Sequence, residues 1–325
     1  MTAEQSRSRS ESRAPGFEGA TGWLNSTPLT AHDLLGKVTL VNFWTYTCVN
    51  WLRQLPYLRA WDATYRPHGL VTVGVHTPEF GFERRVDNVE LAVREMGISY
   101  PVALDSEYAV WASFANRYWP ALYFVDREGR LRHHHFGEGA YDRSEQVIRE
   151  LLGVHDLPAA AAIEAQGAEV AADWDHLQSP ETYLGSARSD SFAYPSGPRF
   201  GQPHTYTEPP PLPLNHWSLH GTWAIAQESC TMTEAAGSLV MRFHARDLNL
   251  VMGPTDCCDT VHFRVTLDGQ APDDAHGEDV DAEGFGAVTH QRLHQLIRQT
   301  GHIEDRTFEI TFLDPAVQVF AFTFG

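Results

Sequence analysis

The chain has 325 residues, 42% of them hydrophobic and 20% charged, a composition typical of a folded, soluble protein with room for two domains. Its formal net charge of −18 argues against nucleic acid or an anionic membrane surface as a partner, because both select for basic patches. Four cysteines are too few for a disulfide scaffold in a chain of this length.

The chain begins with a polar stretch rich in serine and arginine, MTAEQSRSRSESRAPGFEGATGW. It lacks the apolar core of a signal peptide, and no later stretch reaches the run of about 18 apolar residues that a transmembrane helix requires. We therefore expect residues 1–14 to be a disordered leader, and the protein to be cytoplasmic with no membrane partner.

Residues 38–152 alternate between strand-like and helix-like patterns in the order β-α-β-α-β-β-α. The runs KVTLVNFW and LVTVGVHT are continuous and apolar, which is typical of strands buried on both faces. The other expected elements are a helix over 48–69 with a kink at Pro56, an amphipathic helix over 84–97, a hairpin over 121–137 with DREG as its turn, and a helix over 142–153 capped by Asp142 or Ser144.

The sequence pattern changes after the last of these helices. Ala-rich residues 156–176 favour a connecting helix, and the many prolines of residues 194–214 favour an extended tether. Short apolar runs follow, and in one of them Phe308, Ile310 and Phe312 alternate with polar residues as in a half-buried antiparallel strand. Such runs indicate a β-sandwich. The aromatic residues expected in its core are Trp217, Trp223, Phe243 and Phe263.

One cysteine, Cys48, lies where a strand becomes a helix. Its sulfur would lie near the helix N-terminus, where free N–H groups and the helix dipole favour the nucleophilic thiolate. The alternative is a small buried hydrophobic residue. Pro120 stands just before the hairpin, and a proline opposite such a cysteine is often cis and leaves the backbone of its neighbour free to pair with a substrate.

Three stretches carry a family resemblance: NFWTYTC, VGVHTPEF and YWPALYFVDREGRLRHHHFGEG. Together they resemble a thioredoxin-fold domain of the TlpA/ResA/DipZ group. The chain from SPETYLGSAR onward is similar to the jelly-roll module that follows this domain in DipZ-type proteins. The resemblance implies that Cys48 is the attacking cysteine, that Pro120 is the cis-proline, and that Glu79 is an acidic residue near the thiol that accepts a proton.

The chain departs from this family at the redox motif, because the CxxC of the family reads Cys48-Val49-Asn50-Trp51. Without the second thiol, no disulfide can form within the motif. A single cysteine can still form a mixed disulfide with a small or protein thiol and await a second thiol that releases it. In an alternative without redox chemistry, Trp51 fills the space of the missing sulfur, and the cleft binds or transforms a small molecule.

Peroxide reduction is another open route, in which the thiolate becomes a sulfenic acid that an outside thiol restores. Thr45, three residues before Cys48, has the placement of a peroxidatic hydroxyl donor. The signal is weak, because Val41 stands where peroxiredoxins carry a proline.

Three further features carry weaker functional signals. Cys230, Cys257 or Cys258 could resolve Cys48 if disulfide geometry allowed it, although structural cysteines are the simpler interpretation. His133 and His135 would share one face of a strand and could bind zinc or copper with Glu138 or His76. Within the acidic stretch 272–286, Asp279, Asp281, Glu283 and Gly284 resemble the start of a calcium loop, but the twelfth position counted from Asp279 is His290, so a solvated turn fits better. We therefore predict no metal site.

The sequence thus predicts an α/β thioredoxin-like domain over 15–155, a helical and Pro-rich linker over 156–214, and an all-β jelly-roll domain, similar to carbohydrate-binding modules, over 215–325. We expect a thiol-dependent oxidoreductase without a cofactor that acts on a small molecule or protein and takes a small or protein thiol as reductant. The expected catalytic residues are Cys48, Glu79 and Pro120. The expected substrate-binding residues are Trp44, Tyr46, Trp51 and Trp119.

Overall fold

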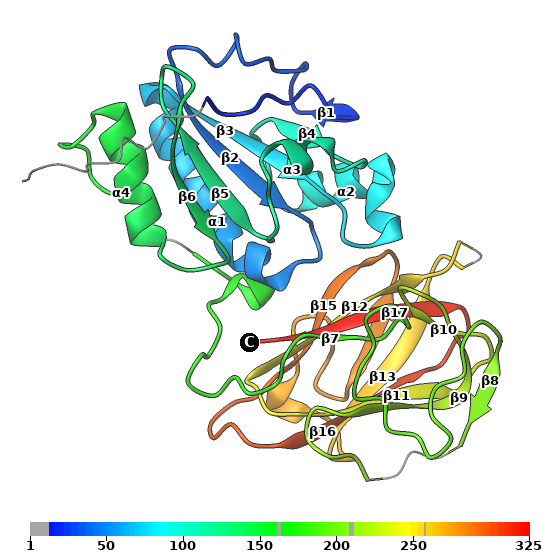
Figure 1. Cartoon of the computed structure of the whole chain (residues 1–325). Coiled ribbons are helices and arrows are strands. Elements are labelled where there is room, and N and C mark those ends of the chain that lie inside the picture. Colours follow the sequence, from blue (N-terminus) through cyan, green and yellow to red (C-terminus); the bar gives the residue numbers. More distant parts are fainter. Residues whose placement is uncertain (1–12, 161–163, 208–210, 257) are drawn as a thin grey trace, which may run out of the picture. The chain divides into compact units, whose positions relative to one another are not determined.

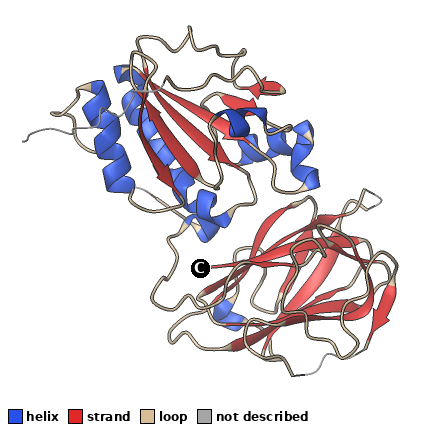
Figure 2. Cartoon of the chain, in the orientation of Figure 1, coloured by secondary structure: helices blue, strands red, loops and turns tan. Residues whose placement is uncertain are grey.

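The computed structural model describes residues 13–160, 164–207, 211–256 and 258–325. The chain divides into two compact units, one ending at Glu164 and the other beginning at Ala165 (Figure 1). Apart from short 3-10 turns, the described helices lie in the first unit, whereas the second consists of strands and loops (Figure 2). Within these residues, no helix combines the length and the apolar character needed to cross a membrane.

The first unit is built on a six-stranded mixed sheet in the order β1-β4-β3-β2-β5-β6. Its strands are β1 (Gly22–Leu24), β2 (Val38–Trp44), β3 (Leu70–His76), β4 (Val102–Leu104), β5 (Ala121–Val125) and β6 (Leu131–Phe136). Its helices are α1 (Val49–Tyr65), α2 (Val86–Glu95), α3 (Ala109–Ser113) and α4 (Tyr141–Leu152), with 3-10 turns η1 (Arg66–His68) and η2 (Gly81–Arg84). β2, β3 and β4 are mutually parallel, and β5 and β6 form the expected antiparallel hairpin.

Every residue of the central strand β2 is buried, as its unbroken apolar run predicts. Its side chains alternate between the two faces of the sheet. Val41 and Phe43 join an apolar cluster with residues of β3, β5 and α3, whereas Asn42 bonds to Gln54 on α1. The short elements β1, β4 and α3 were not expected. α4 begins after Ala140 without a side-chain cap, so the prediction of Asp142 or Ser144 as its cap was wrong.

The connecting helix expected over residues 156–176 is not formed in the described part of that range, which holds one 3-10 turn, η3 (Gly167–Glu169). An Ala-rich segment of this length is marginal as a helix unless an apolar face packs against the rest of the protein, and Pro158 and Gly167 interrupt it. The range 156–214 also holds two strands of the second unit, so it is more than a linker.

The second unit is a β-module with one continuous network of eleven strands. They are β7 (Thr182–Tyr183), β8 (His204–Tyr206), β9 (Trp217–Ile225), β10 (Cys230–Met232), β11 (Gly237–Phe243), β12 (Asp247–Pro254), β13 (Val261–Leu267), β14 (Phe285–Val288), β15 (Arg292–Arg298), β16 (Arg306–Phe312) and β17 (Val317–Phe324), with a 3-10 turn η4 (Asp273–Ala275).

The β-module encloses a single large apolar core, as expected of a β-sandwich. Phe308 on β16 and Phe322 on β17 meet edge to face at 6.0 Å, although their strands lie in different arms of the network. The alternation of Phe308, Ile310 and Phe312 is confirmed, since all three are fully buried. The aromatic residues expected in the core, Trp217, Trp223, Phe243 and Phe263, are also fully buried.

Candidate functional site

Three chain segments meet at one edge of the sheet in the first unit. β2 and β3 are parallel and end side by side at the pair Trp44 and His76, and the next N–H, of Thr77, donates to Trp44 O at 3.0 Å. β5 runs the opposite way and begins at Ala121, the partner of Phe43. The loop before α1, the loop after β3 and the residues before β5 therefore share this edge.

Cys48 lies at this edge as the N-cap residue of α1. Its carbonyl accepts the first helical hydrogen bonds, from the N–H groups of Trp51 at 3.0 Å and Leu52 at 2.9 Å. The residue is half-buried, so part of it is open to solvent. At the start of the neighbouring strand the Trp119–Pro120 peptide is cis, as predicted. Because β2 and β5 are neighbours, the loop after β2 with Cys48 and the residue before β5, Pro120, lie at the same edge of the sheet.

The side chain of Trp51 is completely buried, although it occupies the position of the missing cysteine. Its indole N–H donates to Asn42 Oδ1 at 2.9 Å, and Asn42 Nδ2 donates to Gln54 Oε1 at 2.9 Å. The ring also stacks on Trp44 with centroids 4.2 Å apart. Trp51 is therefore locked to β2 by a polar network and a stacked ring.

Three of the four expected substrate-binding side chains, those of Trp44, Tyr46 and Trp51, are buried within the first unit. Trp44 meets the His76 ring edge to face with centroids 4.9 Å apart, and Tyr46 stacks on the same ring at 5.7 Å. Trp119 is half-exposed; its indole N–H donates to Thr77 O at 3.1 Å, and its ring lies 4.3 Å from that of Trp111. Of the four, Trp119 is the one in a position to touch a substrate.

A buried carboxyl group beside the cysteine loop was missed by the sequence interpretation. Glu83 lies in η2 with 1% of its surface exposed. Thr47, the residue before Cys48, donates its hydroxyl to Glu83 Oε1 at 2.6 Å, and the N–H groups of Glu79 and Phe80 donate to Oε2 at 2.6 and 2.9 Å. Burial raises the pKa of Glu83 to about 7, although these hydrogen bonds lower it.

The expected proton acceptor, Glu79, lies four residues before Glu83 and is half-buried. Its backbone N–H is bound by the Glu83 carboxylate, and its negative charge adds to the raised pKa of Glu83. Glu83 accepts the N–H of Phe80, the N-cap residue of η2, which ties its carboxyl to buried backbone. Phe80 lacks the polar side chain by which a capping box is recognised in a sequence, so the sequence held no clear signal for Glu83.

Thr45 is fully buried, which bears on the peroxide route. Its hydroxyl lies 3.5 Å from His76 Nε2 and also lowers the pKa of Glu83 through a hydrogen bond. Burial lowers the pKa of His76 to about 3, so the imidazole is neutral near pH 7. The Thr45 hydroxyl is thus directed to buried groups, which does not favour a role as donor to peroxide at an exposed thiol.

The other cysteines belong to the β-module. Cys230 is completely buried in β10, and its thiol donates to Leu184 O at 3.3 Å. A thiol in that position is a core residue and is not accessible to a mixed disulfide. Cys258 is half-buried in the loop after β12, and Cys257 lies outside the described residues. Resolution of Cys48 by Cys257 or Cys258 stays a prediction.

The histidine strand and the acidic loop are both held by protein groups. His133 and His135 share the less exposed face of β6, as predicted, but no group of three metal-ligating side chains occurs among the described residues. In the acidic loop, Asp279 pairs with Arg292 at 2.5 Å and accepts the Gln295 N–H at 2.7 Å. Asp281 accepts the Phe285 N–H at 2.7 Å. These carboxylates therefore shape a turn.

The fold and this site define a thioredoxin-like protein, and comparisons with known proteins agree. Residues 11–134 match the model of the AhpC/TSA family, and residues 179–325 match that of a thioredoxin-like C-terminal domain. YkuV of Bacillus subtilis, a thiol-disulfide oxidoreductase, is 30% identical over 139 residues, which are 42% of this chain and 93% of that protein. The chain therefore belongs to the thioredoxin-like family of YkuV, through its first unit.

The protein DipZ of Mycobacterium bovis matches across both units, with 36% identity over 251 residues. The match covers 74% of this chain and 35% of DipZ, so the chain spans about a third of the length of that relative. Among solved structures, an oxidised thioredoxin-like protein is similar at 28% identity with a TM-score of 0.42, covering 45% of this chain and 98% of that one.

Proposed function

We propose that the protein carries out thiol-disulfide exchange with one cysteine, Cys48, as its nucleophile. The observation that carries the proposal is the placement of Cys48 at the N-cap of α1, half-exposed and at the same sheet edge as Trp119 and Pro120. The free N–H groups of the first helical turn stabilise negative charge on a sulfur at this position. Trp119 and Pro120 then lie where a substrate chain would approach.

The exchange takes place in two steps that balance without a cofactor. The Cys48 thiolate attacks one sulfur of a substrate disulfide, a new S–S bond forms to Cys48, and the other substrate sulfur leaves as a thiolate. A second thiol, small or on a protein, then attacks the mixed disulfide and releases Cys48. Because position 51 is a tryptophan locked to Asn42, the release depends on this external thiol.

Glu83 supports proton movement in this scheme. Thr47 connects its carboxyl to the residue before Cys48, and a pKa of about 7 lets the carboxyl hold or release a proton near neutral pH. We propose that it takes the proton of the Cys48 thiol and returns one to the leaving thiolate, either through Thr47 or through water. The sequence assigned this role to Glu79, which forms part of the same turn. A cytoplasmic location stays a prediction.

The test is the reactivity of Cys48 with iodoacetamide against pH, followed by intact-mass analysis after oxidised glutathione is added. We expect a thiol pKa below the usual value of about 8.5 and one glutathione per chain, removed by excess thiol. Cys48→Ser abolishes the adduct, whereas Cys258→Ser, the matched control in the β-module, retains it. An oxidised protein that has lost two hydrogens and carries no adduct would overturn the single-cysteine mechanism.

A further inference from the structure

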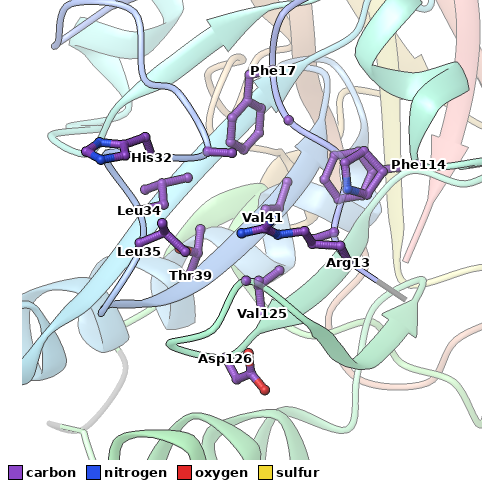
Figure 3. Close-up of a pocket in the computed structure, with 15 residues that line it drawn as sticks. Arg13, Phe17, His32, Leu34, Leu35, Thr39, Val41, Phe114, Val125 and Asp126 are labelled. Carbon is purple, nitrogen blue, oxygen red and sulfur yellow. The ribbon is translucent and has the colours of Figure 1, made fainter. Parts of the chain in front are cut away.

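A cavity lies in the first unit, away from Cys48 along the sheet. It has a volume of about 340 Å³ and lies beside the turn between β5 and β6, between the chain segments 13–17 and 31–35 (Figure 3). Thr39, near the start of β2, is part of its wall. Cys48 follows the other end of this strand, and five strand residues from Thr39 to Trp44 span roughly 17 Å. The two sites are therefore separate.

The walls of this cavity are mostly apolar. Its main hydrophobic side chains are Phe17, Leu34, Leu35, Val41, Phe114 and Val125. Leu35 is 42% exposed and also lines the cavity. The volume lies in the range of small-molecule sites, about 300–1,000 Å³, and the lining suits a hydrocarbon or aromatic body.

Two polar groups in the cavity have no protein partner among the described residues. Thr39 is 2% exposed, and its hydroxyl has no hydrogen-bond partner there. A buried hydroxyl without a partner is costly, so a ligand atom that bonds to it would be favoured. The Arg13 side chain points across the cavity toward the side of Thr39 and Leu35 (Figure 3), and no described carboxylate lies within ion-pair distance of it.

The one carboxylate of the cavity wall, that of Asp126, is already paired with Arg130 and Arg132. It accepts from Arg130 Nε and from Arg132 Nη1, each at 3.1 Å, and from the backbone N–H of Arg130 at 2.8 Å. These contacts hold its pKa below the usual range. Besides the exposed imidazole of His32 at its rim, the cavity therefore presents one guanidinium group, one hydroxyl without a protein partner and an apolar wall.

We propose that this cavity binds a small organic carboxylate with an apolar body. The carboxylate would pair with Arg13 and accept the hydrogen bond of Thr39 Oγ1, and the hydrocarbon would lie against Val41, Phe114 and Val125. A guanidinium group is a strong partner for a carboxylate because two parallel N–H donors match its two oxygens. A neutral alcohol would leave Arg13 unpaired, and an amine would be repelled by it.

Calorimetric titration of the full chain with octanoate, 1-octanol and octylamine tests the proposal. We expect octanoate to bind at one site, and octylamine to bind at least tenfold more weakly. Arg13→Ala should lose about tenfold or more in octanoate affinity, because it removes a charge-assisted pair. The affinity of the same variant for 1-octanol should fall less than threefold. Thr39→Val keeps the shape and removes the hydroxyl, so it should cost about threefold to tenfold.

Arg94→Ala, an exposed arginine on α2 outside the cavity, is the matched control and should leave binding unchanged. Ala31→Trp, which would fill the cavity from its exposed rim, should abolish binding while the melting temperature is kept. If Arg13→Ala and the unmodified chain bound octanoate with equal affinity, the proposal would be overturned. So would binding that occurs solely after residues 1–12 are removed, because that segment would then be the natural occupant.

Discussion

The hydroxyl of Thr47 donates to Oε1 of Glu83 at 2.6 Å, which ties the residue before the candidate nucleophile to a buried carboxyl group. The two residues are 36 positions apart in the chain and come from the loops that follow β2 and β3. The cysteine loop is therefore held in place by a group whose own protonation changes near neutral pH. This relationship has consequences for both stability and reactivity.

The first prediction concerns the stability of Glu83→Gln against pH. The folded-state pKa of about 7 lies above the usual 4.5, so between these values the folded protein holds a proton that the unfolded chain has lost. The Glu83 contribution to stability is thus present below pH 4.5 and decreases as pH rises to 7. Relative to Glu83→Gln, the free energy of unfolding of the unmodified chain should fall by up to about 3 kcal/mol between pH 4.5 and pH 7.

Hydrogen exchange of β2 and β3 peptides, corrected for intrinsic rates, measures this difference in the first unit alone. Glu79→Gln is the control, since it keeps the buried Glu83 carboxyl and removes only the smallest cause of its raised pKa, so most of the pH dependence should remain. A stability difference between the unmodified chain and Glu83→Gln that stays constant with pH would contradict the raised pKa.

The second prediction is a kinetic one. If Glu83 titrates near Cys48, the alkylation rate of Cys48 should show an inflection near pH 7 in addition to the ionisation of the thiol itself. Glu83→Gln should remove this inflection and leave a single-step profile. Iodoacetamide labelling with mass-spectrometric site assignment gives both curves. The same two-step profile in Glu83→Gln would show that Glu83 plays no part in the chemistry of the thiol.

The third prediction concerns Trp51. Trp51→Phe keeps much of the ring packing but leaves the buried Asn42 Oδ1 without its donor, which should cost about 1–3 kcal/mol. Trp51→Ala also opens a cavity beside Trp44 and should cost about 3–5 kcal/mol. Hydrogen exchange of α1 peptides measures both losses. Trp119→Phe, which alters a half-exposed indole, should cost less, and an equal loss would contradict the locking role of Trp51.

The fourth prediction concerns the pair of Arg53 on α1 and Glu138 after β6. Arg53 Nη1 lies 3.0 Å from Glu138 Oε1, and the two side chains are 3% and 11% exposed. Burial raises the pKa of Glu138, and Arg53 offsets this effect. Arg53→Met leaves the buried Glu138 carboxylate without its partner and should lower the free energy of unfolding by about 3–5 kcal/mol. Arg53→Met combined with Glu138→Leu should recover most of that loss.

A double-mutant cycle on thermal unfolding of the first unit measures this recovery. Arg143 and Glu150 of α4 form an exposed pair at 3.8 Å and are the matched control, for which single changes should cost about 0–1 kcal/mol. If the losses of unfolding free energy at Arg53 and Glu138 were additive, the two side chains would not be coupled, and the prediction would be wrong.

The order of the main elements and the position of Cys48 could be predicted because both depend on local pattern. A mostly apolar run such as β2 must be buried on both faces, and the residue that joins it to the following helix must lie near the helix N-terminus. The cis peptide before Pro120 was also foreseen, through the family resemblance. The short elements β1, β4 and α3 have too little periodic sequence to be predicted.

The sequence by itself determined the fold class, the two units and the loss of the second thiol, since these are written in hydrophobic pattern and residue identity. The tertiary structure alone decided what surrounds the thiol. Trp44, Tyr46 and Trp51 are as apolar in a cleft as in a core, and only packing shows that they are buried. Glu83 became the site carboxyl because long-range contacts with Thr47 and the turn at Phe80 remove it from water, and desolvation depends on position in space rather than on position in the chain.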